Sequence, residues 1–525
     1  MKKEDKNVAE VLVECLEAHG IKYIFGVPGE ENLNFLEAVR KSKITFITTR
    51  HEQAAAFMAA TFGRLTDKIG VALSTLGPGA TNLLTGVAYA QLSGFPLLVI
   101  TGQKPIKNNK QGKFQIVDIV SMMKPVTKFT TTIAESGNIA NIVYEAISLA
   151  EAERPGAVHL ELPEDISEEI CNASSLTPSK ITHPVENKKA ITLALRDIEK
   201  SKRPLIVLGR GANKNFFRKP LEEFFNKTSI PFISTQMGKG AFDESLKLYI
   251  GTTALSDGDY VHKALHHADL VIMIGHDAIE KPSFIFNNKI TKIIYINYFS
   301  FTFTNKININ PDWDFSYFLK VRDMLKKDIA KFSDSTDFPL RPERIIGDIQ
   351  KVLSKNDMLA LDNGMYKIYF SRNFITKKPN GLLLDNTLAT MGAGLPSGIA
   401  LKIIYPKRKV LVVAGDGGIM MSIAELETAV RLKLNLVVLL LDDSGFGMIR
   451  WKQKDMNLAS FGLSFNNPDF VMLAESFGAV GHKINKATDL LPTLKKALNS
   501  KGVHVIACPI SYEEANKVLG TIKNI

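Results

Sequence analysis

The segment from Gly415 to Gly447 is the part of this chain that most restricts its fold. It begins with Gly-Asp-Gly directly after an apolar run, KVLVVA, and ends with Asp442-Asp443 and a glycine-rich turn directly after a second apolar run, LNLVVLLL. The stretch between them, SIAELETAVRLK, has the periodicity of a helix. Strand, helix and strand in this order predict a right-handed βαβ unit with two parallel strands. Asp416 and Asp443 should then lie close together at the sheet edge where open α/β sheets bind ligands.

This arrangement suits a diphosphate that is held through a divalent cation. Magnesium prefers near-octahedral oxygen ligands and usually takes one or two carboxylates together with phosphate oxygens and water. Gly415, Gly417 and Gly418 allow the backbone to approach phosphate groups, and the N-terminus of the following helix favours an anion. The alternative is a tight glycine turn in an ordinary α/β protein with two solvated aspartates. The full spacing, which ends in a carboxylate pair and a second glycine-rich turn, favours the diphosphate site.

The segment resembles the thiamine-diphosphate motif, in which Gly-Asp-Gly is followed at this distance by an asparagine. Its amino-acid sequence, ELETAVRLK…GMIRWKQ, is most similar to that of acetolactate synthase and its close relatives. The resemblance spans nearly the whole chain. The family usually has asparagine where this chain has Asp443, which keeps an oxygen ligand but adds a negative charge. The resemblance implies thiamine diphosphate and Mg²⁺ as cofactors, with Asp416, Asp443 and the backbone carbonyl of Gly445 as metal ligands.

The chain has 525 residues, which is enough for about three domains. Short apolar strands alternate with helical patterns throughout, as is typical of parallel α/β layers. Two polar, proline-containing stretches, 168–190 and 327–343, divide the chain. We therefore expect three doubly wound parallel-sheet α/β domains. By the resemblance these are a pyrimidine-binding domain (1–175), a central Rossmann-like domain (188–328) and a diphosphate-binding domain (342–525).

Composition excludes several other classes of protein. The net charge is +11, but the lysines are scattered and no basic stripe carries interleaved aromatic residues, so we expect no nucleic-acid partner. The chain has no run of eighteen apolar residues, so we expect no membrane span. The first residues, MKKEDKNVAE, lack the apolar core of a signal peptide. Three widely spaced cysteines without CxxC spacing predict reduced thiols and a cytoplasmic location.

The middle segment begins with PLIVLGRGANKN, a strand followed by a GxG turn. The third glycine of a dinucleotide fingerprint is missing, so a turn in a structural Rossmann-like domain is the better interpretation. Some members of the family bind FAD in this domain and carry an arginine in a GVRFDDR segment. The matching stretch here, ADLVIMIGHDAIEKPSF, lacks that arginine, which argues against FAD.

Glu52 stands at a predicted strand-to-helix junction in ITFITTRHEQAAAFMAATFGRL. Taken alone, a glutamate in the first turn of a helix usually interacts with the helix dipole. However, RHEQAAAFMA is similar to the activating-glutamate segment of the family. There the carboxylate bonds to nitrogen N1′ of the cofactor's aminopyrimidine and favours the imino tautomer, which removes the proton from the thiazolium C2 carbon. Such a carboxylate works best when it is partly desolvated.

Two loops and one glutamine complete the N-terminal half of the expected site. The resemblance implies that FGVPGEEN, with Pro28, and STLGPGATN border the aminopyrimidine. Glu30 stands where relatives often have a small residue, which leaves the acceptor substrate open. Gln115, in KQGKFQIVD, matches a glutamine that lines the reaction centre in the family. By itself, a glutamine in a lysine-rich loop is usually exposed to solvent.

In the last third of the chain, NTLATMGAGLPSGIA is rich in glycine and precedes a helix. The resemblance implies that the carbonyl of Ala389 accepts a hydrogen bond from the cofactor's 4′-amino group and that Met391 wedges between its two rings. A packed core methionine explains Met391 equally well from sequence alone. The other residues implied to lie beside the cofactor are Asn363, Gly364, Phe446, Gly447 and Met448.

The resemblance implies a carboligase that decarboxylates pyruvate and joins the hydroxyethyl unit to a second 2-oxo acid, giving 2-acetolactate when the acceptor is pyruvate. Another 2-oxo acid decarboxylase, an aldehyde carboligase or a non-catalytic paralogue are the alternatives. The loop Lys107–Gln115 has no histidine to protonate the intermediate, which favours ligation, and Glu52 argues against glyoxylate carboligase, which lacks that glutamate. The family pairs its first and third domains across a subunit interface, which implies a homodimer or tetramer with shared active sites.

Overall fold

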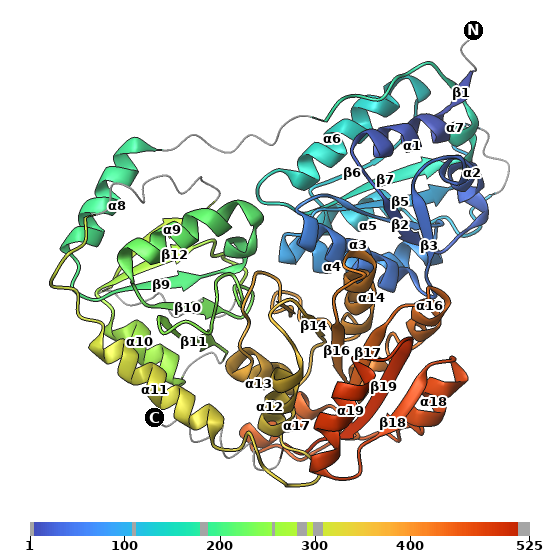
Figure 1. The fold of residues 1–525 in the computed structure, drawn as a ribbon. Helices are drawn as coiled ribbons and strands as arrows, with labels where there is room; N and C mark the ends of the chain where they lie inside the picture. The colour runs from blue at the N-terminus through green and yellow to red at the C-terminus, as the bar shows by residue number, and fades with distance from the viewer. Residues whose placement is uncertain are drawn as a thin grey trace. The chain divides into compact units, whose positions relative to one another are not determined.

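The computed structural model describes residues 5–107, 112–178, 187–254, 258–280, 291–297 and 308–512. Parts of four segments of the sequence analysis, residues 1–4, 108–111, 179–186 and 281–284, lie outside the described residues. The chain divides into two compact units (Figure 1). Unit 1 consists of Met1–Thr182 with two later segments, Ile399–Ile404 and Ser422–Leu432, and unit 2 contains the rest. Three parallel sheets confirm the predicted fold class.

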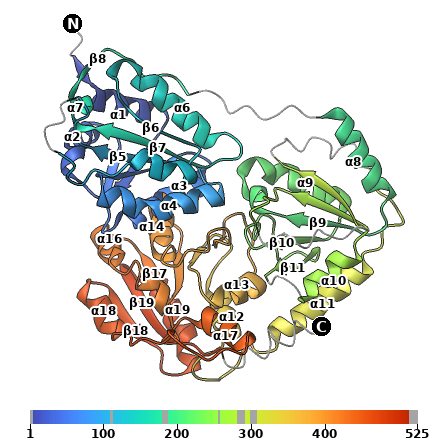
Figure 2. The same cartoon turned by 180° about the vertical axis from the view of Figure 1, so that it is seen from behind.

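Unit 1 is built on a parallel sheet with the strand order β3-β2-β4-β5-β7-β6. Helices α1 and α6 cover one face of this sheet, and α3 and α4 cover the other (Figures 1 and 2). Two short strands, β1 (Lys6–Asn7) and β8 (Ile170–Cys171), pair antiparallel outside it. The strands of the sheet are β2 (Tyr23–Gly26), β3 (Thr45–Thr48), β4 (Gly70–Ser74), β5 (Leu97–Gln103), β6 (Phe129–Thr132) and β7 (Ala157–Pro163), and the helices are α1 (Val8–Ala18), α2 (Leu33–Lys41), α3 (Glu52–Thr66), α4 (Pro78–Ser93), α5 (Ile119–Met123), α6 (Ile139–Glu151) and α7 (Glu164–Glu168).

The chain order of unit 1 reverses direction at β2, because β3 is added on one side of it and β4 on the other. Ligands of open α/β sheets bind at such a switch point, beyond the carboxyl ends of the strands. The loops after β2 and β4, which contain Pro28 and Gly77, therefore flank the position where this sheet can hold a ligand.

Unit 2 contains a five-stranded parallel sheet with the order β11-β10-β9-β12-β13. In the GxG turn after β9, a Cβ atom on Gly209 would lie 2.5 Å from the Cα of His276, and one on Gly211 would lie 3.0 Å from the Cα of Gly275. The two glycines therefore let this turn pack against the end of β12. The elements are β9 (Pro204–Leu208), β10 (Phe232–Thr235), β11 (Tyr249–Thr253), β12 (Leu270–Ile274), β13 (Lys292–Ile296), α8 (Lys188–Lys200), α9 (Arg218–Thr228), α10 (Tyr260–His267) and α11 (Ser316–Ala330).

The second sheet of unit 2 has six parallel strands in the order β15-β14-β16-β17-β19-β18. Its switch point lies between β14 and β16, because β15 is added on the far side of β14. The strands are β14 (Met358–Leu361), β15 (Leu382–Leu383), β16 (Val410–Gly415), β17 (Leu436–Asp442), β18 (Val480–Lys483) and β19 (Val503–Pro509), and the helices of this part of the chain are α12 (Pro342–Val352), α13 (Tyr366–Asn373), α14 (Gly394–Ile404), α15 (Asp416–Ile419), α16 (Glu425–Arg431), α17 (Gly447–Asp455), α18 (Phe470–Ser476) and α19 (Leu490–Ala497).

The predicted βαβ unit is present, with Gly415 opposite Leu441 in the parallel pair β16–β17. The helix of this unit is shorter than predicted. The sequence pattern covers residues 422–433, whereas α16 begins at Glu425, ends at Arg431 and is preceded by a turn. The N–H groups of Glu425 and Leu426 bond to carbonyls three residues back, at Ser422 and Ile423. Such tighter bonding is typical of a 3₁₀ turn at a helix start.

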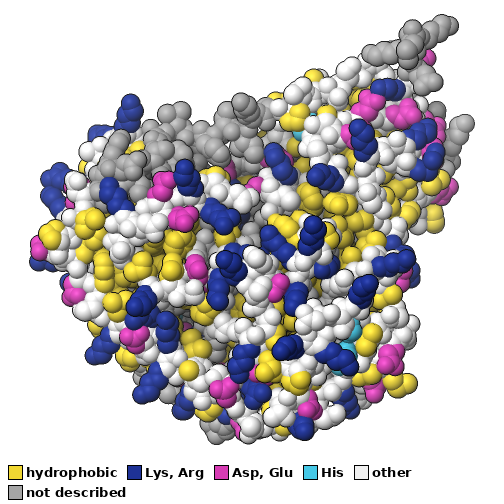
Figure 3. Space-filling model, viewed as in Figure 1, with side chains coloured by type: hydrophobic (Ala, Val, Ile, Leu, Met, Phe, Trp, Pro, Cys, Tyr) yellow, Lys and Arg dark blue, Asp and Glu magenta, His cyan; other side chains and the backbone are white. Residues whose placement is uncertain are grey.

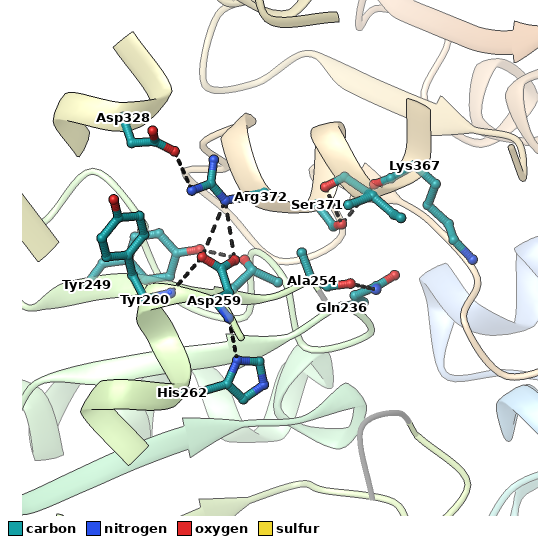
Figure 4. Close-up of polar contacts among 12 residues, drawn as sticks. Gln236, Tyr249, Ala254, Asp259, Tyr260, His262, Asp328, Lys367, Ser371 and Arg372 are labelled. Carbon is teal, nitrogen blue, oxygen red and sulfur yellow. Dashed lines mark hydrogen bonds and ion pairs between the residues drawn. The ribbon is translucent and has the colours of Figure 1, made fainter. Parts of the chain in front are cut away.

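Helix α13 is fixed to the neighbouring sheet of unit 2 through Arg372 (Figure 4). The buried guanidinium lies 3.2 Å from the carboxylate of Asp259 and 2.6 Å from that of Asp328. Asp259 also caps α10 by accepting the N–H of Tyr260 at 2.7 Å. One arginine therefore joins α13 to α10 and α11.

The surface gives further information on partners. On the face drawn in Figure 3, lysine and arginine side chains are spread among acidic and uncharged ones. No helix within the described ranges is long and apolar enough to cross a membrane.

Candidate active site

A cavity of about 230 Å³ lies in unit 2 at the switch point between β14 and β16. The loop after β14 supplies Asn363 and Gly364 to its wall, and the end of β16 supplies Gly415 and Asp416. All residues predicted for the diphosphate half of the site line this one cavity. These residues are Asn363, Gly364, Ala389, Met391, Gly415, Asp416, Gly417, Gly418, Asp443, Gly445, Phe446, Gly447 and Met448.

One wall of the cavity leaves no room for side chains. A Cβ atom on Gly415 would lie 2.9 Å from a ring carbon of Tyr366, and one on Gly417 would lie 2.9 Å from a ring carbon of Phe446. On Gly418 it would lie 2.3 Å from a carboxylate oxygen of Asp362. At these three positions the wall therefore presents backbone, which allows the close approach of phosphate groups. The glycines fit a diphosphate group.

Three carboxylates meet beside this wall. Asp416 is buried at the start of α15, Asp442 is the last residue of β17, and Asp443 follows it. The side-chain amide of Asn467 donates hydrogen bonds to Asp416 and to Asp442, both at 2.8 Å. Its two hydrogen bonds hold together the ends of the two strands that carry the acids.

The electrostatics of Asp443 show that the acids interact. Burial, followed by the negative charge of Asp416, raises the pKa of Asp443 to about 7, although the guanidinium of Arg450 at 3.4 Å opposes this rise. Burial is also the main cause that raises the pKa of Asp416. A divalent cation would relieve this repulsion, and carboxylate oxygens are ligands of the kind that Mg²⁺ prefers.

The loop opposite the glycine wall is held by a buried lysine. The ammonium group of Lys367 donates hydrogen bonds to the side-chain oxygen of Asn363 at 2.7 Å and to the carbonyl of Asp385 at 3.0 Å. The Asn363 amide in turn donates to the carbonyl of Thr390 at 2.8 Å. Ala389 has a positive φ of 56°, which is uncommon for alanine, and its N–H donates to the Asp385 carboxylate at 2.6 Å. The N–H of Thr390, which shares a peptide group with the carbonyl of Ala389, donates to the same carboxylate at 3.4 Å and restricts the orientation of that carbonyl.

Met391 precedes helix α14 and lies at the cavity. Its side chain is half-buried and lines the cavity, whereas the apolar core of the helix begins after it, at Ala393 and Leu395. Met391 is therefore a wall residue of the cavity.

A second group of predicted residues lies in unit 1. Glu52 is the first residue of α3 and is only 9% exposed. Its carboxylate accepts a hydrogen bond from the side-chain amide of Asn82 at 3.0 Å. A Cβ atom on Gly79 would lie 3.3 Å from the same carboxylate. The first turns of α4 therefore lie against the carboxylate of Glu52.

The remaining N-terminal predictions lie beside the loop that follows β4. Gly77 has a positive φ of 46°, and a Cβ atom on it would lie 2.6 Å from the carbonyl oxygen of Gln115. Gln115 itself has a positive φ of 58° and is exposed. Pro28 is exposed, and the adjacent Gly29 approaches the side chain of Thr75, because a Cβ atom on this glycine would lie 2.3 Å from that of Thr75.

Several site residues could not be identified from the sequence. Lys367 had a weak signal, since it is a single lysine in the otherwise apolar start of α13, YKIYF. Asn467 and Arg450 had none, because their contacts to the acids depend on how the loops fold back. The cavity residues missed by the sequence prediction are Met365, Tyr366, Lys367, Ile449 and Tyr512.

Comparison with known families agrees with this architecture. Residues 6–122 match the N-terminal TPP binding domain of thiamine pyrophosphate enzymes, residues 191–325 match their central domain, and residues 362–508 match their C-terminal TPP binding domain. The chain belongs to the thiamine pyrophosphate (thiamine diphosphate) enzyme family.

Curated relatives extend over nearly the whole chain. A probable acetolactate synthase large subunit of Methanococcus aeolicus is 31% identical over 94% of this chain and 90% of its own length. The catabolic acetolactate synthase of Raoultella terrigena is 30% identical over 98% of this chain and 97% of its own. The acetolactate synthase of Bacillus subtilis (strain 168) is 29% identical over 96% and 93%, respectively. The protein is thus a thiamine-diphosphate-dependent enzyme with acetolactate synthase homologues.

Proposed function

We propose that this enzyme is a carboligase that decarboxylates pyruvate and transfers the remaining two-carbon unit to a second 2-oxo acid, which gives 2-acetolactate when the acceptor is pyruvate. The observation that carries the proposal is the cavity in which Asp416, Asp443 and the bare glycine wall converge. The names of the relatives support the acetolactate product.

The cavity residues would hold the cofactor and its metal. Gly415, Gly417 and Gly418 would bind the diphosphate through backbone, while Asp416, Asp443 and the Gly445 carbonyl would bind Mg²⁺. Asn363 and Gly364 would lie beside the diphosphate, and Phe446, Gly447 and Met448 would cover the cofactor. Thiamine diphosphate supplies the carbanion and the electron sink for this chemistry.

The chain's own catalytic work is proton control. Glu52 would hold a proton at nitrogen N1′ of the aminopyrimidine, with Asn82 fixing the orientation of its carboxylate. The carbonyl of Ala389 would accept a hydrogen bond from the 4′-amino group, and Met391 would hold the two rings at an angle. Gln115, together with the Pro28 loop, would border the substrate.

The proposal includes an assembly. The three domains would span residues 1–175, 188–328 and 342–525, and the first domain of one copy would complete the site in the third domain of another. The protein would then be a homo-oligomer whose monomer has no turnover. Dilution through the dimer dissociation range should abolish the specific activity, and full activity in a monomer verified by sedimentation would exclude a shared site.

The direct test is Glu52→Gln in a pyruvate-consumption assay with thiamine diphosphate and Mg²⁺. Loss of a general acid–base group lowers turnover by roughly 10²- to 10⁴-fold. Glu37→Gln is the matched control, because Glu37 is an exposed residue on α2 that pairs with Arg40. An undiminished rate in Glu52→Gln would remove the role assigned to Glu52.

Product analysis separates the carboligase from its alternatives. Acetolactate, which decarboxylates to acetoin in acid, is the expected product, whereas acetaldehyde would identify a simple decarboxylase. Isothermal calorimetry that shows no binding of thiamine diphosphate in the presence of Mg²⁺ would identify a non-catalytic paralogue.

A further inference from the structure

The backbone just before Glu52 is bonded to a carboxylate from a distant part of the chain. The N–H groups of Arg50 and His51 both donate to one oxygen of Glu425, at 3.0 and 3.1 Å. Glu425 is the first residue of α16, is 1% exposed, and lies in unit 1 together with Glu52. The contact therefore joins positions 375 and 374 residues apart.

These backbone groups have no partner in regular structure. Arg50 and His51 lie between the end of β3 at Thr48 and the start of α3, where N–H groups precede the first helical turn. Arg50 and His51 are exposed residues, but the two N–H groups face the buried carboxylate of Glu425 in part-buried hydrogen bonds, and a backbone donor shielded from water is costly to leave unpaired. A carboxylate accepts two donors with one oxygen and keeps the other for a further bond, so Glu425 suits this junction better than a neutral side chain.

The carboxylate is itself fixed in place. The hydroxyl of Thr428 donates to the second oxygen of Glu425 at 2.6 Å. Burial raises the pKa of Glu425, and the hydrogen bonds from Thr428 and from the two N–H groups oppose this rise. At the far end of α16, the guanidinium of Arg431 donates to the carbonyl of Thr48 at 2.5 Å. Both ends of α16 thus hold the segment from Thr48 to His51.

Glu52 follows His51 directly, so whatever fixes this peptide also fixes the start of the glutamate side chain. We propose that Glu425 is a positioning residue for the activating glutamate. It acts through the two hydrogen bonds to the β3–α3 junction and does not contact the cofactor. The inference rests on the proposed role of Glu52 and adds the residue that aligns it.

The position of Glu425 in the sequence gives this contact a second consequence. Glu425 belongs to the segment between Gly415 and Gly447, whose two ends would bind the diphosphate and the metal. In the proposed oligomer, Glu52 of the same chain would serve the cofactor of another copy. One βαβ segment would then hold one cofactor and align the glutamate that activates the next.

The test uses the full-length holoenzyme and measures the rate at which deuterium replaces the C2 proton of bound thiamine diphosphate. This exchange requires cofactor and Glu52 but no substrate. Glu425→Ala should slow the exchange by on the order of 10²-fold, because displacement of a reacting group by about an ångström costs this much. Glu425→Gln keeps an acceptor oxygen and should lie between Glu425→Ala and wild type. The calorimetric dissociation constant of the cofactor should change less than about threefold, since loss of a positioning group alters the reactive alignment more than binding.

Glu161→Gln is the matched control. Glu161 is likewise a buried glutamate of unit 1, and it accepts hydrogen bonds from Gln103 and Thr132. Its exchange rate should equal that of wild type. Equal slowing in Glu161→Gln and Glu425→Gln would show a general structural effect and overturn the positioning role. Wild-type exchange rates in both Glu425→Gln and Glu425→Ala would also overturn the positioning role. If Glu425→Ala does not fold, a wild-type exchange rate in Glu425→Gln alone would overturn it.

Glu52→Gln separates failure of this inference from failure of the proposed function. If Glu52→Gln slows C2 exchange and the Glu425 variants do not, the positioning role is wrong while the function stands. If Glu52→Gln leaves the exchange rate unchanged, the role of Glu52 is wrong, and the positioning role falls with it.

Discussion

The guanidinium of Arg450 lies 3.4 Å from the carboxylate of Asp443, across the turn that joins β17 to α17. It also packs directly on Gly445, because a Cβ atom on that glycine would lie 2.1 Å from a guanidinium nitrogen. A cation of the chain therefore stands beside the three carboxylates of Asp416, Asp442 and Asp443. These carboxylates repel a diphosphate, and Arg450 offsets part of that charge.

This pair predicts a non-additive effect on cofactor binding. Arg450→Gln should raise the dissociation constant of thiamine diphosphate at fixed Mg²⁺ by about three- to tenfold. The smaller effect is expected at high salt, because Arg450 is partly exposed and its charge is screened by ions. Asp443→Asn removes the charge that Arg450 offsets, so Asp443→Asn/Arg450→Gln should bind more tightly than the sum of the single effects predicts. Calorimetry measures all four proteins. Lys452→Gln, an exposed lysine on the same helix, is the control, and strict additivity would contradict the pairing.

The raised pKa of Asp443, about 7, predicts a pH dependence. A protonated carboxyl is a poor metal ligand, so affinity for Mg²⁺ should fall as the pH drops through about 7. Without added metal, the free energy of unfolding should change in the opposite direction. The pKa of the Asp443 carboxyl is higher in the folded than in the unfolded protein. Its contribution to stability is therefore complete below about pH 4 and is lost as the pH rises through about 7. Thermal unfolding with and without Mg²⁺ across this range measures both effects, and Asp443→Asn should flatten them. A wild-type curve that matches that of the variant would refute the assignment.

Local patterns indicated the acids and glycines of the cavity, and the family resemblance indicated its other predicted residues. Apolar runs that end in Gly-Asp-Gly and Asp-Asp place both acids at the same sheet edge, because the carboxyl ends of parallel strands coincide. Gly415 pairs with Leu441 in the structure, so the two apolar runs end at the same level of the sheet. The segment STLGPGATN lies after β4, at the switch point of the sheet of unit 1.

Contacts that depend on tertiary folding could not be predicted. Nothing in the sequence near Arg50 indicates that Glu425 would satisfy its N–H, because the contact spans most of the chain. Asn467 lies in an irregular loop without periodicity, so only the folded structure shows its hydrogen bonds to Asp416 and Asp442.

The two hydrogen bonds of Asn467 predict that it supports the metal site. Asn467→Ala would leave Asp416 and Asp442 without this donor and allow the strand ends to separate. Loss of a group that orients metal ligands usually costs 10- to 100-fold in metal affinity, and we expect a decrease of about tenfold in the affinity for Mg²⁺. Titration of Mg²⁺ in the presence of thiamine diphosphate gives the value. Asn466→Ala changes the exposed neighbour and should have no effect, and equal losses in both variants would indicate a general loop effect.

The ion pairs of Arg372 in Figure 4 predict a large contribution to stability. The Asp259 carboxylate is fully buried, so Arg372→Met would leave it with the α10 cap as its main support. Removal of one partner of a buried pair costs about 3–5 kcal/mol, whereas exposed pairs contribute about 0–1 kcal/mol. Lys292→Met is the matched control. Lys292 lies on β13 of the five-stranded sheet of unit 2 and forms a surface ion pair with Asp197 at 2.8 Å.

Urea denaturation followed by tryptophan fluorescence measures the difference, because Trp313 packs against the core of that sheet. Arg372→Met should lower the unfolding midpoint strongly, and Lys292→Met should leave it nearly unchanged. Arg372→Met should also weaken thiamine diphosphate binding, because α13 begins at Tyr366 in the cavity wall and Arg372 fixes its far end. A lower midpoint with unchanged cofactor affinity would show that the anchor stabilises the fold without shaping the site, whereas equal midpoints in the two variants would refute the buried pair as a source of stability.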